Sequence, residues 1–496
     1  TLIHNTPHIS EPEVVIFRMK FLLTLSVLLT QLFCFSQTIL IKNAVIVDVE
    51  TGKLISNRQL LVSNGIITVI SKSKKDLKAD SVIDAKGMYI IPGLWDFHTH
   101  VWNEAVTFPL LIANGVTGLR GMFEDVNNVK RWRQSISAGK YPTLSIFSAG
   151  PIVDGPKPIW PGSVAVTDAA KGRKAVDSLK NKLKVDFVKV YSLLSRDSYF
   201  AIADECKKQT ILFAGHVPNV LTVLEAAQAG QSTQEHLYGF LEAASDSSDT
   251  WFAYQRGEIK DSIWKQRSFR KQFLFRTFNE KKLEGILKEI KKTNTWVCPT
   301  LTVNRGIAYV NDTSLLHDPR MVYMGNFMRD FWDYRKDFRF QSFKPVDFED
   351  NRTEFELKLK ITRKIYKAGI PLLAGTDFPN PHCYPGFGVH DELEWLVKAG
   401  LTPAAALQTA TMNPAKYMNT FATEGSIAVN KKANLVFLTA NPLQNISNTK
   451  QIEMVMVNGK LFTKQQLEVM MESVKKLVTA LPQQPATVGF HVHEDE

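Results

Sequence analysis

The chain has 496 residues, of which 44% are hydrophobic and 22% are charged. This composition is typical of a globular protein and excludes a disordered or fibrous one. Lys and Arg exceed Asp and Glu by 60 to 49, a formal net charge of +11, but part of the surplus lies in residues 256–292, where basic and aromatic residues alternate as in amphipathic helices. No nucleic-acid-binding motif accompanies it, so the sequence predicts no nucleic-acid partner.

Residues 1–37 are predicted to be a leader and signal peptide outside the fold. The apolar run at 21–35 has the length of a signal-peptide core and is too short for a stable membrane span. Cys34 and Ser36 place small residues at −3 and −1, which predicts cleavage after Ser36 and a periplasmic or extracellular product. The alternative is a lipid anchor on Cys34, although the bulky Phe33 before it disfavours lipidation.

The segment 38–91 consists of short β-rich runs separated by Asn-Gly and similar turns. Matching runs return in 422–465, more than 300 residues later. Two half-sheets so far apart predict one small β-sandwich interrupted by a large inserted domain. In 466–496, apolar residues recur at helical spacing, which predicts a C-terminal helix followed by a tail.

The insert at 92–421 alternates apolar strands with helical stretches, a pattern typical of βα units around a parallel sheet. Eight candidate strands are the number that a closed (β/α)₈ TIM barrel needs. The predicted fold class is therefore α/β, a TIM barrel inserted into the β-sandwich. Long additions at 237–292 and 303–355 are expected on the carboxyl-terminal rim, where barrel enzymes bind substrates. The candidate strands are Gly93–His98, Gly115–Leu119, Thr143–Ser148, Asp186–Tyr191, Ile211–His216, Ser232–His236, Thr295–Leu301 and Pro371–Asp377.

Histidines and one aspartate gather at the ends of these strands. His98 and His100 end the first strand and, because strand side chains alternate, point to the same face, where two imidazoles can bind one ion. Such a pair alone can equally be two hydrogen-bonded polar residues at a strand end. His216 and His236 end the fifth and sixth strands and Asp377 ends the eighth. Their common position favours a metal site.

Lys189 lies in the middle of the fourth strand with apolar neighbours on both sides. Burial lowers the pKa of an amine and makes its uncharged form accessible. An uncharged lysine can add carbon dioxide to form a carbamate, whose two oxygens can bridge two metal ions. The alternatives are a lysine whose ammonium reaches solvent and one paired with Asp186.

Taken together, the His-x-His pair, the strand lysine, the two single histidines and the final Asp resemble the amidohydrolase superfamily. The resemblance covers nearly the whole chain after the leader and is nearest to the imidazolonepropionase-like and prolidase-like (Xaa-Pro dipeptidase-like) branch of exported metal-dependent hydrolases. Lys189 favours binuclear, dipeptidase-like members over the mononuclear imidazolonepropionase. The further matching motifs are Ile90–Leu94, Ala214–Pro218, Gln234–Leu237 and Leu401–Leu407.

The resemblance implies a set of ligands for each of two metal ions. His98, His100 and Asp377 would hold the first ion. His216 and His236 would hold the second, and carboxylated Lys189 would bridge the two. The expected ions are Zn²⁺, with Mn²⁺ or Fe²⁺ as alternatives.

This arrangement predicts a hydrolase in which two metals activate a shared water as hydroxide. Asp377 would take the proton of that hydroxide and give it to the leaving nitrogen. The predicted reaction is hydrolysis of an amide C–N bond in a dipeptide, an N-acyl amino acid or a cyclic amide. Alternatives are lactonase-like, phosphotriesterase-like or deaminase activity at the same site, or a non-catalytic scaffold that has lost its metals.

Four further residues are candidate contacts to a small-molecule or dipeptide substrate. Tyr191 and Tyr238 each follow a metal-ligand candidate by two residues, and either could donate a hydrogen bond to the substrate carbonyl or be an ordinary rim tyrosine. His390 matches a histidine that often contacts substrate in this branch. Arg120 follows the second strand and could bind a carboxylate or form a surface salt bridge. A homo-oligomer is possible.

Overall fold

The computed structural model describes residues 38–72 and 77–481. The expectations for the leader at 1–37, including cleavage and lipidation at Cys34, and for the tail after residue 481 lie outside these residues. Within the two described ranges, no helix combines the length and the apolar character needed to cross a bilayer.

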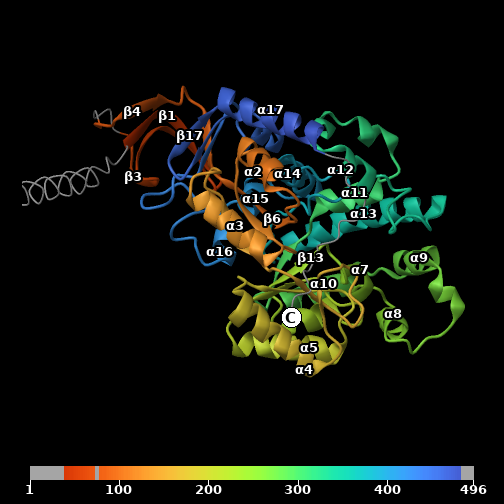
Figure 1. The fold of residues 1–496 in the computed structure, drawn as a ribbon. Helices are drawn as coiled ribbons and strands as arrows, with labels where there is room; N and C mark the ends of the chain where they lie inside the picture. The colour runs from red at the N-terminus through yellow and green to blue at the C-terminus, as the bar shows by residue number, and fades with distance from the viewer. Residues whose placement is uncertain (1–37, 73–76, 482–496) are drawn as a thin grey trace, which may run out of the picture.

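One mixed sheet joins the two ends of the described chain (Figure 1). The long strand β1 (Thr38–Asp48) pairs antiparallel with β2 (Lys53–Ser63) and parallel with β5 (Tyr89–Pro92), and β5 pairs antiparallel with β15 (Leu435–Leu438). The predicted association of the amino- and carboxyl-terminal β segments is therefore confirmed as a mixed sheet. Its other strands are β3 (Ile66–Ser71), β4 (Ser81–Asp84), β16 (Ile452–Val457) and β17 (Lys460–Thr463).

The insert forms two parallel sheets. A three-stranded sheet has the order β6-β7-β8 and a six-stranded sheet the order β10-β9-β11-β12-β13-β14. Seven of the eight predicted strands appear; β6 and β7 are shifted toward the carboxyl terminus, and the other five are shorter than predicted. The strands are β6 (Leu94–Thr99), β7 (Val116–Gly121), β8 (Ser145–Ser148), β9 (Ile152–Asp154), β10 (Val164–Ala165), β11 (Val188–Val190), β12 (Phe213–Gly215), β13 (Thr233–Glu235) and β14 (Trp296–Cys298).

The eighth predicted strand, 371–377, forms no regular ladder: Leu372 makes an isolated bridge to β14, and Phe378, just after the segment, makes one to the end of β6. The Phe97 amide donates to Ala374 O at 2.8 Å, and the Leu373 amide donates to Val297 O at 3.0 Å. The segment therefore lies between the two sheets. The α/β class with parallel strands is confirmed, but the described residues form two linked sheets and not one continuous closed barrel sheet.

Helices follow the strands and bury apolar stripes against them. In α10, the Asn279 side chain accepts from the Lys281 and Lys282 amides and caps the helix, and its buried residues recur at Leu283 and Leu287. The α-helices are α2 (Glu104–Ala113), α3 (Val126–Ser137), α4 (Ala169–Asp177), α5 (Arg196–Lys208), α6 (Val223–Gln228), α10 (Glu280–Ile290), α14 (Phe387–Ala399), α15 (Pro403–Thr409), α16 (Met412–Tyr417) and α17 (Lys464–Ala480). The short segments η1 (Ser178–Leu183) and η5 (Ile446–Lys450) complete this set.

The two long additions are themselves helical. Figure 1 shows α8 and α9 far from the mixed sheet, whereas α17 lies beside α2, where Val474 and Val478 pack on Val106 and Leu110. The first addition contains α7 (Phe240–Ala243), α8 (Ser248–Gln255), η2 (Ser262–Lys265), α9 (Arg267–Thr277) and α10. The second contains most of α11 (Leu301–Ala308), η3 (Thr313–His317), η4 (Pro319–Tyr323), α12 (Asn326–Phe331) and the first part of α13 (Pro345–Lys367).

Two glycine substitutions test the packing of the insert. At Gly118 in β7, an added methyl group would overlap the buried indole of Trp95, whereas at Gly285 in α10 it would meet nothing within 4 Å. We expect Gly118→Ala to lower the free energy of unfolding by about 1–3 kcal/mol through overpacking. Gly285→Ala should raise it by roughly 0.5–1 kcal/mol through helix propensity. Urea titration of both variants measures the difference, and equal stabilities would contradict the packing of β6 on β7.

Candidate metal centre

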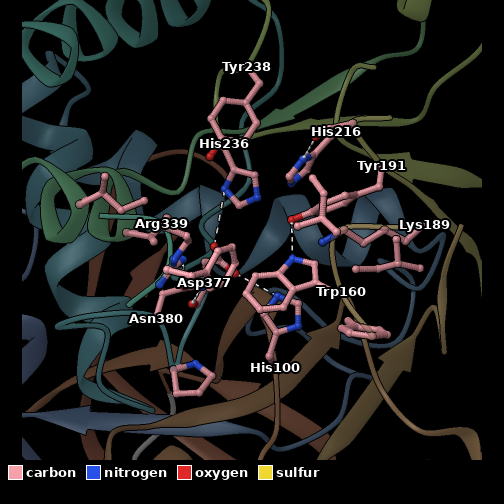
Figure 2. Close-up of a pocket in the computed structure, with 18 of the residues that line it drawn as sticks. His100, Trp160, Lys189, Tyr191, His216, His236, Tyr238, Arg339, Asp377 and Asn380 are labelled. Atoms are coloured by element: carbon pink, nitrogen blue, oxygen red, sulfur yellow. Dashed lines mark hydrogen bonds and ion pairs between the residues drawn. The ribbon is translucent and has the colours of Figure 1, made fainter. Parts of the chain in front are cut away.

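The six residues predicted to bind metal gather at a cavity of about 1070 Å³, and Figure 2 shows all of them except His98. Five of them line the cavity, and His98 lies fully buried beneath them. His100 Nε2 is 3.0 Å and His98 Nε2 is 3.4 Å from Asp377 Oδ1. Lys189 Nζ is 3.4 Å from the same His98 nitrogen. The strand ends therefore bring together residues that are up to 279 positions apart in the sequence.

The remaining two histidines complete the cluster. The His236 ring lies 4.5 Å from the His98 ring and 4.8 Å from the His216 ring, centroid to centroid. His236 Nδ1 is also 3.9 Å from Asp377 Oδ2. Each of the six side chains thus has at least one other member of the set as a direct neighbour.

The donor atoms fit a divalent ion. One nitrogen from each of His98 and His100 and one oxygen from Asp377 lie within 4.8 Å of one another. Burial lowers the pKa of His98, of His216 and of His236 well below the ordinary value of 6.5, so these imidazoles are neutral at pH 7. Neutral imidazole and carboxylate are the protein ligands that zinc accepts.

A buried acid fixes the orientation of His98. Its Nδ1 lies 2.8 Å from Glu235 Oε2, and Glu235 Oε1 accepts from Arg120 Nη2 at 2.8 Å, with all three side chains inaccessible to solvent. A carboxylate holds the proton on Nδ1, which leaves the Nε2 lone pair directed toward Asp377 and Lys189. Glu235 was not among the predicted site residues, and its one signal in the sequence is an acidic residue inside an otherwise uncharged buried strand.

Lys189 is the middle residue of β11 and is 1% exposed. Burial lowers the pKa of its amine to about 8, so a fraction on the order of a tenth is uncharged at pH 7. Asp186, the alternative partner, accepts instead from Arg133 Nη2 at 2.6 Å and from the Ser148 amide at 2.7 Å. The amine therefore points to the histidines and not to Asp186 or to bulk solvent.

Two of the candidate ligands have an unusual backbone conformation. His236 has φ +61° and Asp377 has φ +62°, in the left-handed region that side chains other than glycine rarely adopt. Such strain persists only where the surroundings enforce it, and it is common at functional sites. For His236, one enforcing contact is the 2.7 Å pair between its Nδ1 and Thr300 Oγ1.

Both candidate tyrosines lie on the cavity wall. The Tyr191 ring stacks on His216 at 3.9 Å, and its hydroxyl accepts from Trp160 Nε1 at 2.9 Å (Figure 2). The Tyr238 ring lies 5.1 Å from the His236 ring. The structure thus places both phenols next to the histidines, within reach of a substrate at the same end of the cavity.

Arg120 and His390 are not among the described residues that line this cavity. Arg120 is fully buried and donates to Phe97 O, Thr233 Oγ1 and Glu235 Oε1. The ring nitrogens of His390, which is 1% exposed, contact Thr449 Oγ1 at 3.0 Å and the Asn114 carbonyl at 3.1 Å. Neither geometry supports the expected substrate contact, because the polar atoms of both side chains are committed to the protein interior.

The rest of the cavity wall is largely aromatic, and much of it comes from the two helical additions. These segments were predicted to lie on the rim, and Tyr238 is the one residue in them that was predicted to contact substrate. The aromatic lining residues are Trp102, Phe123, Trp160, Trp251, Phe252, Phe327, Phe331 and Phe338.

Replacing Arg120 tests the buried network directly. Arg120→Met removes the cationic partner of Glu235 and leaves a buried carboxylate, so we expect a loss of about 3–5 kcal/mol in the free energy of unfolding. Arg131, which pairs with Glu104 at 3.2 Å and is 56% exposed at the side chain, gives the matched control. Arg131→Met should cost less than about 1 kcal/mol. Similar urea midpoints for both variants would refute the structural role of Arg120.

Comparison with known proteins connects this site to a family. Among curated proteins, the chain is 24% identical over 186 residues to a dihydroorotase from Caldanaerobacter subterraneus subsp. tengcongensis, covering 37% of this chain and 38% of that protein. It is 36% identical over 104 residues to an imidazolonepropionase from Christiangramia forsetii, covering 20% of this chain and 25% of that protein. These matches span well under half the length of the relatives.

Solved structures share the fold over most of the chain. A putative prolidase from Bifidobacterium longum has a TM-score of 0.64 at 20% identity, covering 88% of this chain and 99% of that one. A Xaa-Pro dipeptidase with methionine bound in its active site has a TM-score of 0.62 at 18% identity, covering 86% of this chain and 100% of that one. The model of the amidohydrolase family matches residues 194–462, which is more than half of the sequence. With that match and the cluster of histidines and aspartate above, the chain belongs to the amidohydrolase family.

Proposed function

We propose that the protein is a binuclear metal-dependent hydrolase that cleaves an amide C–N bond in a dipeptide, an N-acyl amino acid or a cyclic amide. The observation that carries the proposal is the convergence of four histidines, one lysine and one aspartate at the end of a single cavity. Family membership and the structural likeness to a putative prolidase and a Xaa-Pro dipeptidase support the bond class.

The proposed ligands follow the geometry of the cluster. His98, His100 and Asp377 share the shortest distances and would hold one ion, and His216 and His236 would hold the second. Carboxylated Lys189 would bridge the ions, which we propose to be zinc. Two such ions, when bound, supply activation of water near neutral pH and polarisation of the scissile carbonyl.

The protein's own groups would move the proton and orient the substrate. Asp377, held 3.0 Å from His100 Nε2, would accept the proton of the attacking water and deliver it to the leaving nitrogen. Because Trp160 donates to the Tyr191 hydroxyl oxygen, the hydroxyl hydrogen of Tyr191 is free to donate to the substrate carbonyl oxygen. Tyr238 faces the same space.

The aromatic walls would exclude water from the reacting groups, and such exclusion strengthens each hydrogen bond to developing charge. We also propose that residues 1–37 direct export, so the hydrolysis would occur in the periplasm or outside the cell.

A hydrolysis screen tests the proposed function. Purified chain loaded with zinc, manganese or iron is assayed against dipeptides, N-acyl amino acids, lactams, lactones and phosphotriesters, and its metal content is measured. The proposal expects about two equivalents of metal per chain and turnover of amides. Turnover of lactones or phosphotriesters alone would refute the bond class, and a chain that retains no metal would refute the mechanism.

Asp377→Asn tests the proton carrier. The amide cannot take up the proton, so we expect kcat to fall by about 10²–10⁴-fold while much of the metal is retained. Asp204→Asn, at a surface residue with a 63% exposed side chain, is the matched control and should keep wild-type rates. Activity and metal content are measured on the same samples, and full activity of metal-loaded Asp377→Asn would remove this residue from the mechanism.

Lys189→Ala tests the bridging carbamate. Loss of the amine removes the carbamate, so we expect activity to be lost and to be partly restored by added short-chain carboxylates, which can occupy the same space between the ions. Lys182→Ala, at an exposed lysine just before β11, should behave like wild type with or without the carboxylate. Wild-type rates in Lys189→Ala would show that the lysine is structural.

A further inference from the structure

A second, smaller cavity lies directly behind Tyr238. It has a volume of about 180 Å³, and Tyr238 and Ile307 line both this cavity and the large one. Its other walls come from α9, which carries Arg267 and Lys271, from α11, which carries Asn304, and from α13, which carries Lys358. The two helical additions therefore build a side cavity that adjoins the candidate metal centre.

Positive charge dominates the lining of the side cavity. Arg267, Lys271 and Lys358 contribute three positive charges, and Glu354 contributes one negative charge, a formal surplus of two. Glu354 Oε1 lies 3.2 Å from Lys358 Nζ, and its other oxygen contacts Lys271. Lys358 also donates to Asn304 Oδ1 at 2.6 Å. One carboxylate is thus shared between two lysines.

Three further acids, Asp347, Asp350 and Glu242, attract these cations electrostatically. Among the described residues, none of the three accepts a hydrogen bond from Arg267, Lys271 or Lys358. Asp350 accepts from Ser268 Oγ at 2.7 Å and also from Gln272. Asp347 accepts from the Lys344 amide at 2.8 Å and comes no nearer than 4.0 Å to Arg267.

Two buried donors at this cavity have no hydrogen-bond acceptor within the described residues, namely Arg267 Nε and Asn351 Nδ2. Such donors are rare in folded proteins and generally indicate a missing water, ion or ligand. Burial, together with the charges of Arg267 and Lys358, also lowers the pKa of Lys271 well below its usual value, and burial lowers that of Lys358. Buried cations with too few anionic partners lower the stability of the folded protein, and a bound anion would offset that loss.

We propose that the side cavity binds a carboxylate of the substrate through Arg267, Lys271 and Lys358. Lys358 Nζ lies 4.9 Å from the centre of the Tyr238 ring, so a carboxylate here would be separated from the metal ligands by the thickness of one tyrosine side chain. The volume is about that of six water molecules, enough for a carboxylate on a short stem. This inference rests on the proposed function and selects, among its substrates, dipeptides and N-acyl amino acids over neutral cyclic amides.

The test compares hippurate, an N-acyl amino acid, with its neutral carboxamide, hippuramide, on the metal-loaded full chain. In Lys358→Met we expect kcat/KM for hippurate to fall about tenfold or more, because a hydrogen bond to a charged group is lost. The value for hippuramide should stay within about twofold of wild type. The matched control is Lys265→Met at an exposed lysine of η2, which should alter neither value.

A second variant guards against a folding defect. Arg267→Gln should cause the same selective loss, and Arg335→Gln, at an arginine with a 72% exposed side chain, is its control. Circular dichroism confirms that each variant is folded. Equal losses for hippurate and hippuramide, or no loss for either in both cavity variants, would overturn the carboxylate site.

Binding separates failure of the subsite from failure of the proposed function. The amidase proposal is decided by the broader substrate screen and fails if no amide in that screen is cleaved. If hippurate and hippuramide are not cleaved, calorimetric titration of hippurate decides the carboxylate site independently of that result. Binding about tenfold or more weaker to Lys358→Met than to Lys265→Met supports the carboxylate site. Equal dissociation constants overturn it.

Discussion

The candidate metal centre depends on one buried chain of charge, Arg120–Glu235–His98. Arg120 is also held by the Phe97 carbonyl and by Thr233, so it links β6, β7 and β13. Because the ion pair is closed to solvent, neither member can be lost without leaving an uncompensated charge in the interior. The His98 imidazole is therefore fixed in position and tautomer before any ligand arrives, and the other candidate ligands are arranged around it.

The residues of this centre could be predicted because chemistry and position coincide in the sequence. Histidines at the ends of β-rich runs, with an aspartate after the last one, are visible without a structure, and parallel strands then bring them to one edge. Closure of the barrel was harder to predict, since the 371–377 segment lies between β14 and β6 with isolated bridges instead of a regular ladder. A run of apolar residues does not reveal how regularly it pairs.

Contacts that depend on long-range packing were beyond the sequence pattern. Arg120 and His390 were predicted to contact substrate because of their residue types and their positions after predicted strands. In the structure, the side chain of each forms its hydrogen bonds with backbone and side-chain atoms from distant segments. Glu235 was not predicted, because its partners His98 and Arg120 lie more than 100 positions away in the sequence. The side cavity likewise arises where two separate helical additions meet, which no local pattern records.

The mixed sheet has a consequence for the order in which the protein folds. Strand β5 pairs with β15 along its whole length, from Tyr89 to Pro92, and the entire insert lies between the two strands in the sequence. During synthesis, the edge of β5 that pairs with β15 therefore stays unpaired until the insert and β15 have been made. Closing such a long loop is slow, and an open strand edge invites pairing with other chains. We therefore expect the inserted domain to become compact first. Its two ends then lie close together, and β15 can pair with β5 to complete the sheet.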